Sequence, residues 1–148
     1  MIRIHGTSVV LGGDGILLRG PSGSGKSDLA LRLIDGGARL VADDQTELRR
    51  VKDALVMTAP ATIAGCIEAR GIGILHVPSA PAALLRLVVD LIAPEQVERL
   101  PEPAFCTLLG IAVPLLRLAA FEASVPAKLR LALAAGVAAA RAPLQTAS

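Results

Sequence analysis

The segment that most constrains the fold is a glycine-rich stretch at residues 20–27. In order, it consists of Gly20, Pro21, Ser22, Gly23, Ser24, Gly25, Lys26 and Ser27. The spacing Gly-x-x-x-x-Gly-Lys-Ser is the pattern of a phosphate-binding P-loop, which needs a strand before it and a helix after it. An apolar run at 16–19 precedes the loop, and apolar residues recur at helical spacing over 29–34. This agreement disfavours a glycine-rich turn whose lysine is incidental.

Each part of the loop has a use in binding a nucleoside triphosphate. The glycines let backbone N–H groups turn toward the β-phosphate, and the start of the following helix adds its positive dipole end. Lys26 supplies a cation for the β- and γ-phosphates, and Ser27 supplies a hydroxyl for Mg²⁺. The sequence therefore predicts a site for ATP and Mg²⁺.

The strand that feeds the loop also constrains the sheet. Apolar runs at 8–11 and 16–19 flank Gly12-Gly13-Asp14-Gly15, which is typical of a β-hairpin. Common P-loop enzymes instead feed the loop from a parallel, doubly wound sheet, so we expect an α/β fold with a mixed sheet and few helices. Further strands are predicted at 39–42, as a pair over 48–57 that turns at Lys52-Asp53, and as a strand region at 67–77. The segment 84–92 is predicted to be extended or helical, and the segment 60–65 to be a short helix or turn. A loop at 95–103 and a helix at 126–141 complete the predicted elements.

Composition excludes several function classes. Aromatic residues make up 1% of the chain and the net charge is +2, so neither stacking platforms nor a basic footprint for nucleic acid is present. No apolar run reaches about 18 residues and no signal-peptide pattern opens the chain, so we expect a cytoplasmic protein without a membrane partner. Apolar residues nevertheless make up 53%, which favours a homo-oligomer. The length of 148 predicts a single domain over 1–141 and a frayed tail at 142–148.

Two adjacent carboxylates are the first candidates for chemistry. Asp43 and Asp44 end the predicted strand at 39–42, shortly after Lys26 along the chain. An acid at the end of an apolar strand beside a P-loop suits a magnesium-linked carboxylate or a catalytic base. The alternative is that both residues only flank a turn, which aspartate favours.

A second candidate segment is Ile67-Glu68-Ala69-Arg70-Gly71, with His5 as a third element near the start of the chain. On a strand, Glu68 and Arg70 would point to one face, where a carboxylate could join Ser27 on Mg²⁺ and a guanidinium could grip a phosphate. The alternatives are a surface pair on an edge strand and, for His5, an ordinary hydrogen-bonded histidine.

Together these segments resemble the catalytic domain of HPr kinase/phosphorylase, a bacterial regulator of the phosphotransferase system. The match is colinear over about residues 3–92 and includes His5-Gly6, the P-loop, the stretch 39–44 and the stretch 67–75. The last two stretches are more specific than a P-loop. The resemblance implies a fold like that of phosphoenolpyruvate carboxykinase and a hexameric assembly. It also implies ATP-dependent phosphorylation of a serine on an HPr-like phosphocarrier protein, together with the reverse reaction, in which inorganic phosphate releases pyrophosphate.

The resemblance also implies residue roles. Lys26 holds phosphate, Ser27 and Glu68 hold Mg²⁺, and Asp44 exchanges a proton with the substrate serine. The predicted catalytic residues are Asp44, Lys26, His5, Asp43 and Arg70.

The chain departs from the family pattern in two ways. His5 lies almost at the start, so we expect a short form without the family's N-terminal domain, similar to forms in some proteobacteria whose target would be a nitrogen-related phosphocarrier. The region 110–128 lacks the Pro-Gly-Arg triplet that contributes to dephosphorylation, which weakens the case for the reverse reaction. A non-catalytic ATP-sensing module is the alternative function, and a small-molecule kinase is a third. The carboxylate at Asp44 favours an enzyme, because a sensor does not need it.

Overall fold

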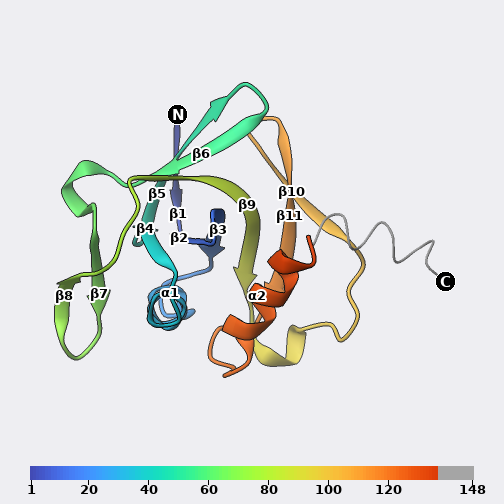
Figure 1. Ribbon diagram of the computed structural model, residues 1–148. Coiled ribbons are helices and arrows are strands. Elements are labelled where there is room, and N and C mark those ends of the chain that lie inside the picture. The colour runs from blue at the N-terminus through green and yellow to red at the C-terminus, as the bar shows by residue number, and fades with distance from the viewer. Residues whose placement is uncertain (137–148) are drawn as a thin grey trace.

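The computed structural model describes residues 1–136 as a mixed sheet with two α-helices and a separate hairpin (Figure 1). The elements are β1 (Ile2–His5), β2 (Thr7–Leu11), β3 (Asp14–Arg19), α1 (Lys26–Asp35), β4 (Arg39–Ala42), β5 (Gln45–Val51), β6 (Ala54–Thr58), β7 (Cys66–Ala69), β8 (Gly73–His76), β9 (Ala82–Leu91), β10 (Ala104–Leu108), β11 (Ile111–Leu118) and α2 (Val125–Ala134). Short 3₁₀ turns lie at Ala61–Ile63 and Pro94–Gln96. In this part of the chain, no helix is long and apolar enough to cross a membrane.

The main sheet runs in the order β1-β5-β6-β9-β3-β2-β4, and β11 adds to β9 with β10 at its outer side. Strand β9 pairs in parallel with both β3 and β11, whereas the β2–β3, β2–β4 and β6–β9 pairs are antiparallel. The first residues of β9 pair with β6 and its last residues pair with β11, so the sheet divides and curls along this strand (Figure 1). The predicted mixed sheet with few helices is confirmed.

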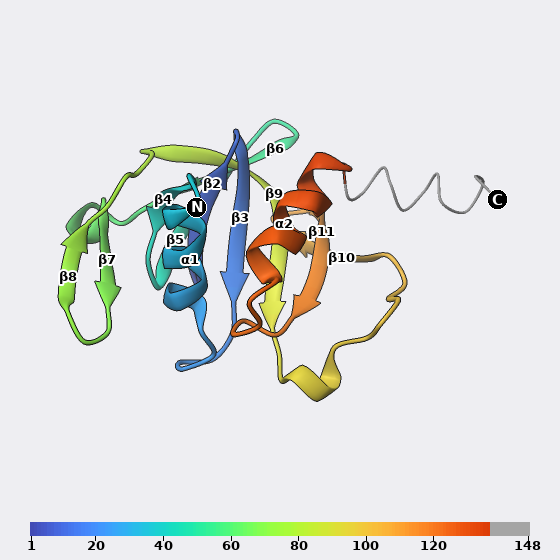
Figure 2. The same ribbon diagram turned by 60° about the horizontal axis from the view of Figure 1, so that its bottom comes forward.

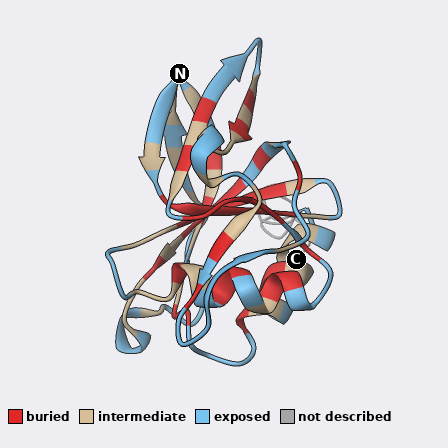
Figure 3. Cartoon of the chain, turned by 90° about the vertical axis from the view of Figure 1, so that its left-hand side faces the viewer, coloured by how far each residue is buried: buried red, intermediate tan, exposed pale blue. Residues whose placement is uncertain are grey.

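Alternation along the central strands produces two apolar cores. On β3, Ile16 and Leu18 face one core and Leu17 faces the other, as the two-residue period of a strand requires. The first core is covered by α1 and α2, through residues such as Leu29 and Leu129. The second core lies between the two arms of the curled sheet. Figure 3 shows the buried residues running along the central strands and along one face of the helices.

The β7–β8 hairpin lies apart from the main sheet, on the side of α1 and β4 (Figure 2). Ile67 of β7 is buried in the first core, whereas the hairpin's far end exposes Ile72 and Ile74. The predicted strand region at 67–77 is therefore two short paired strands. Glu68 enters the site region from this hairpin.

Several predicted elements are confirmed and others are wrong. The hairpin over 8–19 is present and turns at Gly12-Gly13, where both φ angles are positive. The segment 84–92 is extended, as β9, and β5 turns into β6 at Lys52-Asp53 as predicted. Strands β1, β10 and β11 were not predicted.

The predicted helix at 126–141 is wrong at its C-terminal end. Helix α2 ends at Ala134, because Gly136 takes a left-handed conformation (φ 63°) and its N–H donates to the Leu133 carbonyl. The remainder of that prediction and the predicted tail at 142–148 lie outside the described residues.

Candidate active site

The P-loop connects the carboxyl end of β3 to the start of α1, as the sequence predicted. At the last residue of β3, Arg19 makes a bidentate ion pair with Asp90 of β9, at 2.8 and 3.0 Å. The hydrogen bond to Asp90 raises the pKa of the Arg19 guanidinium, and partial burial opposes this rise. The pair joins two parallel strands at the point where the loop begins.

Helix α1 starts directly on the loop. Gly25 is the N-cap, with φ 99°, and a glycine offers no side chain to satisfy the first N–H groups of the helix. Ala120 and Phe121 pack so closely on Gly25 that a Cβ atom at this position would collide with both. Gly25 is therefore required both for its conformation and for its small size, and it leaves the helix N-terminus available to an anion.

Lys26 is the cation of the loop and is 6% exposed. Its Nζ atom donates to the carbonyls of Gly20, at 2.7 Å, and Pro21, at 3.1 Å. The ammonium group is thus folded back over the loop, at the place where a P-loop holds the β- and γ-phosphates.

Asp43 is the centre of the buried hydrogen bonding at this site. One carboxylate oxygen accepts from Ser27 Oγ at 2.6 Å and from Thr7 Oγ1 at 3.2 Å, and the other accepts from the Glu68 N–H at 3.0 Å. The residue is 8% exposed. Asp43 therefore joins α1, β2 and β7 through one carboxylate, and it is more than a turn residue.

Asp44 is the exposed neighbour and pairs with His5. His5 Nε2 lies 2.7 Å from Asp44 Oδ1, and the two side chains are 48% and 60% exposed. Asp44 has a left-handed backbone with φ 65°. Two hydrogen bonds hold that backbone: the Asp44 N–H donates to Thr7 Oγ1 at 3.0 Å, and the Gly6 N–H donates to the Asp44 carbonyl at 2.8 Å. The carboxylate is therefore directed outward beside the P-loop.

Of the two candidate residues on the β7–β8 hairpin, Glu68 is bonded to the site through its backbone and, in the part of the chain that the structure describes, Arg70 is not. Glu68 lies on β7 with an exposed side chain, and its backbone binds Asp43. The expectation that Glu68 and Arg70 share a strand face is wrong, because β7 ends at Ala69 and the chain turns through Gly71, with φ 92°. Within residues 1–136, Arg70 has no hydrogen bond that brings it into the network of Asp43 and Asp44.

The oxygen atoms around Ser27 fit a magnesium ion bound mainly by phosphates. Mg²⁺ prefers hard oxygen ligands and in nucleotide sites takes only one or two protein groups. The Ser27 hydroxyl and the Asp43 carboxylate are hydrogen-bonded to each other, and Glu68 lies on β7, where its N–H binds the same carboxylate. Among the described residues there is no group of three or more His, Cys, Asp or Glu that could hold a metal ion.

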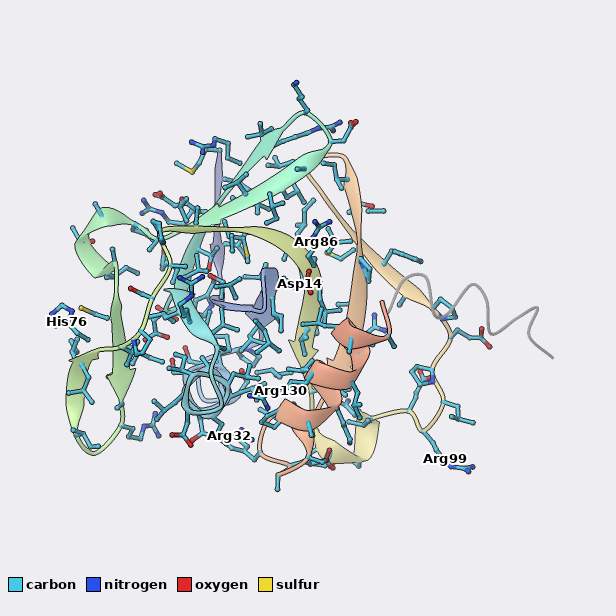
Figure 4. The ribbon with its side chains drawn as sticks, viewed as in Figure 1. Asp14, Arg32, His76, Arg86, Arg99 and Arg130 are labelled. Atoms are coloured by element: carbon cyan, nitrogen blue, oxygen red, sulfur yellow. The ribbon has the colours of Figure 1, made fainter. Side chains whose placement is uncertain are left out.

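The sequence reasoning missed one residue of this site. Thr7 is fully buried, and its hydroxyl donates to Asp43 and accepts from the backbone of Asp44. Its only signal was its position next to His5-Gly6. His76, in contrast, lies on β8 at the edge of the molecule (Figure 4), where its ring nitrogen Nδ1 is 3.5 Å from Cys66 Sγ.

Comparison with known proteins gives one consistent family. The model of the family described as "HPr Serine kinase C-terminal domain" matches residues 1–129. The HPr kinase/phosphorylase of Clostridium tetani is 47% identical over 77 residues, which are 52% of this chain and 25% of that protein. The HPr kinase/phosphorylase of Peptoclostridium acidaminophilum is 41% identical over 112 residues, which are 73% of this chain and 36% of that protein.

A solved structure of a protein with a similar name matches this chain over nearly its whole length. The structure of the Hpr(Ser) kinase/phosphatase from Coxiella burnetii superposes with a TM-score of 0.78 at 28% identity, covering 99% of this chain and 94% of that one. The chain spans about a quarter to a third of the length of the curated relatives.

Proposed function

We propose a function from the premise that this chain belongs to the HPr serine kinase C-terminal domain family. The function is ATP-dependent transfer of phosphate to a serine of an HPr-like phosphocarrier protein of a phosphotransferase system. The observation that carries it is the arrangement of two neighbouring carboxylates. Asp43 is buried against Ser27 of the P-loop, and Asp44 is exposed beside it with His5 at 2.7 Å.

The arrangement supports different roles for the two aspartates. Asp43 orients the Ser27 hydroxyl and ties Glu68 to the P-loop. Asp44 serves as general base for the substrate hydroxyl, since a base must reach the proton it removes and its carboxylate is exposed. With its proton on Nε2, His5 donates to that carboxylate and holds it in position.

The exposure of this pair also supports a protein acceptor. The side chains of His5 and Asp44 lie open at the surface, so a serine on another protein can approach without entering an enclosed pocket. A small-molecule kinase would be expected to surround its acceptor. Lys26 holds the β- and γ-phosphates in this scheme, after exchanging its present carbonyl partners for phosphate oxygens.

Mg²⁺, bound with the nucleotide at Ser27 and Glu68 next to Asp43, would neutralise charge on the transferred phosphoryl group. The protein groups around it perform the positioning. We propose Arg70 as a residue that reaches the substrate only when nucleotide and acceptor are bound, since it lies on the exposed end of the β7–β8 hairpin.

The test is phosphoryl transfer from ATP with Mg²⁺ to a purified HPr-like protein, read by intact mass. Asp44→Asn is expected to lower transfer roughly 10²-fold or more, as for loss of a general base, while nucleotide affinity stays unchanged. Asp53→Asn is the matched control, because that carboxylate is fully exposed in the β5–β6 turn. Transfer by Asp44→Asn at the wild-type rate would refute the assignment of the base.

Absence of transfer with ATP bound would instead favour the ATP-sensing alternative. The relatives' names include a phosphorylase, so release of pyrophosphate from the phosphorylated carrier and inorganic phosphate is a second proposed activity, measured in the same assay. In this chain the reaction would proceed without the Pro-Gly-Arg triplet.

Four further proposals concern the molecule as a whole. The hairpin-fed P-loop on a mixed sheet supports a fold of the phosphoenolpyruvate carboxykinase type. The two apolar cores share β3 and β9, which supports a single catalytic domain. Homo-oligomeric assembly, as a hexamer by resemblance, and a cytoplasmic location stay predictions.

A further inference from the structure

A pocket of about 460 Å³ opens beside the P-loop and has no role in the scheme above. One side is the loop itself, at Pro21 and Ser24. The others are the end of β9 with the residues that follow it, 91–94, and the segment after β11, 119–122. Its volume lies within the range of small-molecule sites.

The strand order places this pocket on the other side of the loop from the catalytic carboxylates. Strands β9 and β11 lie on one side of β3, and β2 and β4 lie on the other, with Asp43 and Asp44 following β4. In open α/β sheets ligands bind outside the carboxyl ends of the strands. A triphosphate in the loop with its γ-phosphate toward Asp44 therefore directs its nucleoside toward the pocket.

Several of the backbone groups around the pocket are already engaged within the protein. The Ala93 carbonyl accepts from the Gln96 N–H at 2.9 Å, and the Ile92 N–H donates to the Leu118 carbonyl at 2.9 Å. On the opposite wall, the carbonyls of Ala120 and Glu122 accept from the guanidinium of Arg32. These bonds turn much of the polar backbone away from an incoming ligand.

The side chains facing the pocket are mostly apolar. Glu122 is paired with Lys128 at 3.5 Å, and Ser24 Oγ is buried without a partner in the described part of the chain. Ser24 belongs to the P-loop, so it marks the end of the pocket at which the phosphates would lie. Phe121 contributes the one aromatic ring of the wall, is 68% exposed and packs on Gly25.

We propose that this pocket binds the base and sugar of the nucleotide through apolar contact and stacking on Phe121, without reading the hydrogen-bonding edge of the base. The inference rests on the proposed function, because it requires the phosphates to occupy the P-loop. It predicts a kinase that accepts nucleotides with different bases about equally. Arg32 is a positioning residue, since it ties the 119–122 wall to α1 (Figure 4).

The experiment measures the affinities of ADP, GDP, CDP and pyrophosphate by calorimetry in the presence of Mg²⁺. The three nucleotides are expected to bind within roughly threefold of one another and each more tightly than pyrophosphate. Phe121→Ala is expected to weaken each nucleotide about tenfold, as for loss of one stacking contact, and to leave pyrophosphate unchanged. Phe105→Ala is the matched control, because it removes an exposed phenyl ring on β10 that does not line the pocket.

Three results would overturn the inference. These are a preference above roughly 30-fold for one base, nucleotide affinities unaffected by Phe121→Ala, and an equal loss of pyrophosphate affinity, which would place Phe121 in support of the loop. The assay contains no phosphocarrier, so failed phosphoryl transfer would leave the pocket inference standing. Failure of every ligand to bind would refute the P-loop and the pocket together.

Discussion

Asp43 and Asp44 are adjacent in sequence, yet their replacement by asparagine should have opposite consequences. Asp43 is nearly buried and accepts three hydrogen bonds, whereas Asp44 is exposed and accepts one from a side chain that is itself half exposed. Asp43→Asn should therefore destabilise the protein. Asp44→Asn should leave stability almost unchanged and lower phosphoryl transfer roughly 10²-fold or more.

The size of the first effect follows from the geometry around Asp43. An asparagine there can keep its oxygen toward the hydroxyls of Ser27 and Thr7, but its NH₂ group then faces the Glu68 N–H. One hydrogen bond to a charged group is lost, at a cost of about 1.5–3 kcal/mol, and a buried donor is left unsatisfied. The opposite orientation of the amide displaces the two hydroxyls instead, so neither orientation avoids a loss.

Thermal and urea unfolding of the ligand-free protein measure this effect. For a chain of this size about 1 kcal/mol corresponds to a shift of about 2–4 °C, so Asp43→Asn should lower Tm by roughly 5–10 °C. Asp44→Asn should stay within roughly 4 °C of wild type, since an exposed side-chain pair such as His5 and Asp44 contributes about 1 kcal/mol or less. Equal stability of Asp43→Asn and wild type would refute the view that Asp43 organises the site.

Three further predictions concern the surrounding structure. Thr7→Val should cost about 1–3 kcal/mol in urea unfolding because it removes a buried hydroxyl that both donates and accepts. Thr7→Ser keeps the hydroxyl and should lose only about 0.8 kcal/mol for the buried methyl group, so a larger loss for Thr7→Ser than for Thr7→Val would refute a hydrogen-bonding role. Asp44→Gly should retain wild-type Tm or exceed it, because glycine relieves the left-handed backbone at φ 65°, while phosphoryl transfer is lost; a large fall in Tm would contradict this. Leu129→Ala should cost about 2–5 kcal/mol in the same unfolding assay, because this fully buried side chain fixes α2 on the first core, and a loss below about 1 kcal/mol would show that α2 contributes little.

Local pattern was sufficient wherever the physical cause is local. The P-loop could be predicted because its glycines, its lysine and the following helix are neighbours in the chain, and the turn at Gly12-Gly13 could be predicted for the same reason. Strands β10 and β11 were missed because their apolar residues follow one another almost without a break, so the sequence does not display the alternating burial that the strands have, and β11 is fixed by its pairing with β9. The end of α2 was misjudged because alanine-rich sequence continues past the glycine that stops the helix.

The sequence by itself predicted a phosphate-binding loop fed by a hairpin, and it selected both aspartates as candidates. Only the tertiary structure decided which aspartate is buried against the loop and which one is exposed. Thr7 and Asp43 are 36 positions apart, His5 and Asp44 are 39 apart, and Arg32 reaches a carbonyl 88 positions away. Burial and hydrogen-bond partners are properties of such distant contacts. For that reason the buried role of Asp43, the exposed role of Asp44 and the apolar pocket at Phe121 appear only once the sheet has brought these segments together.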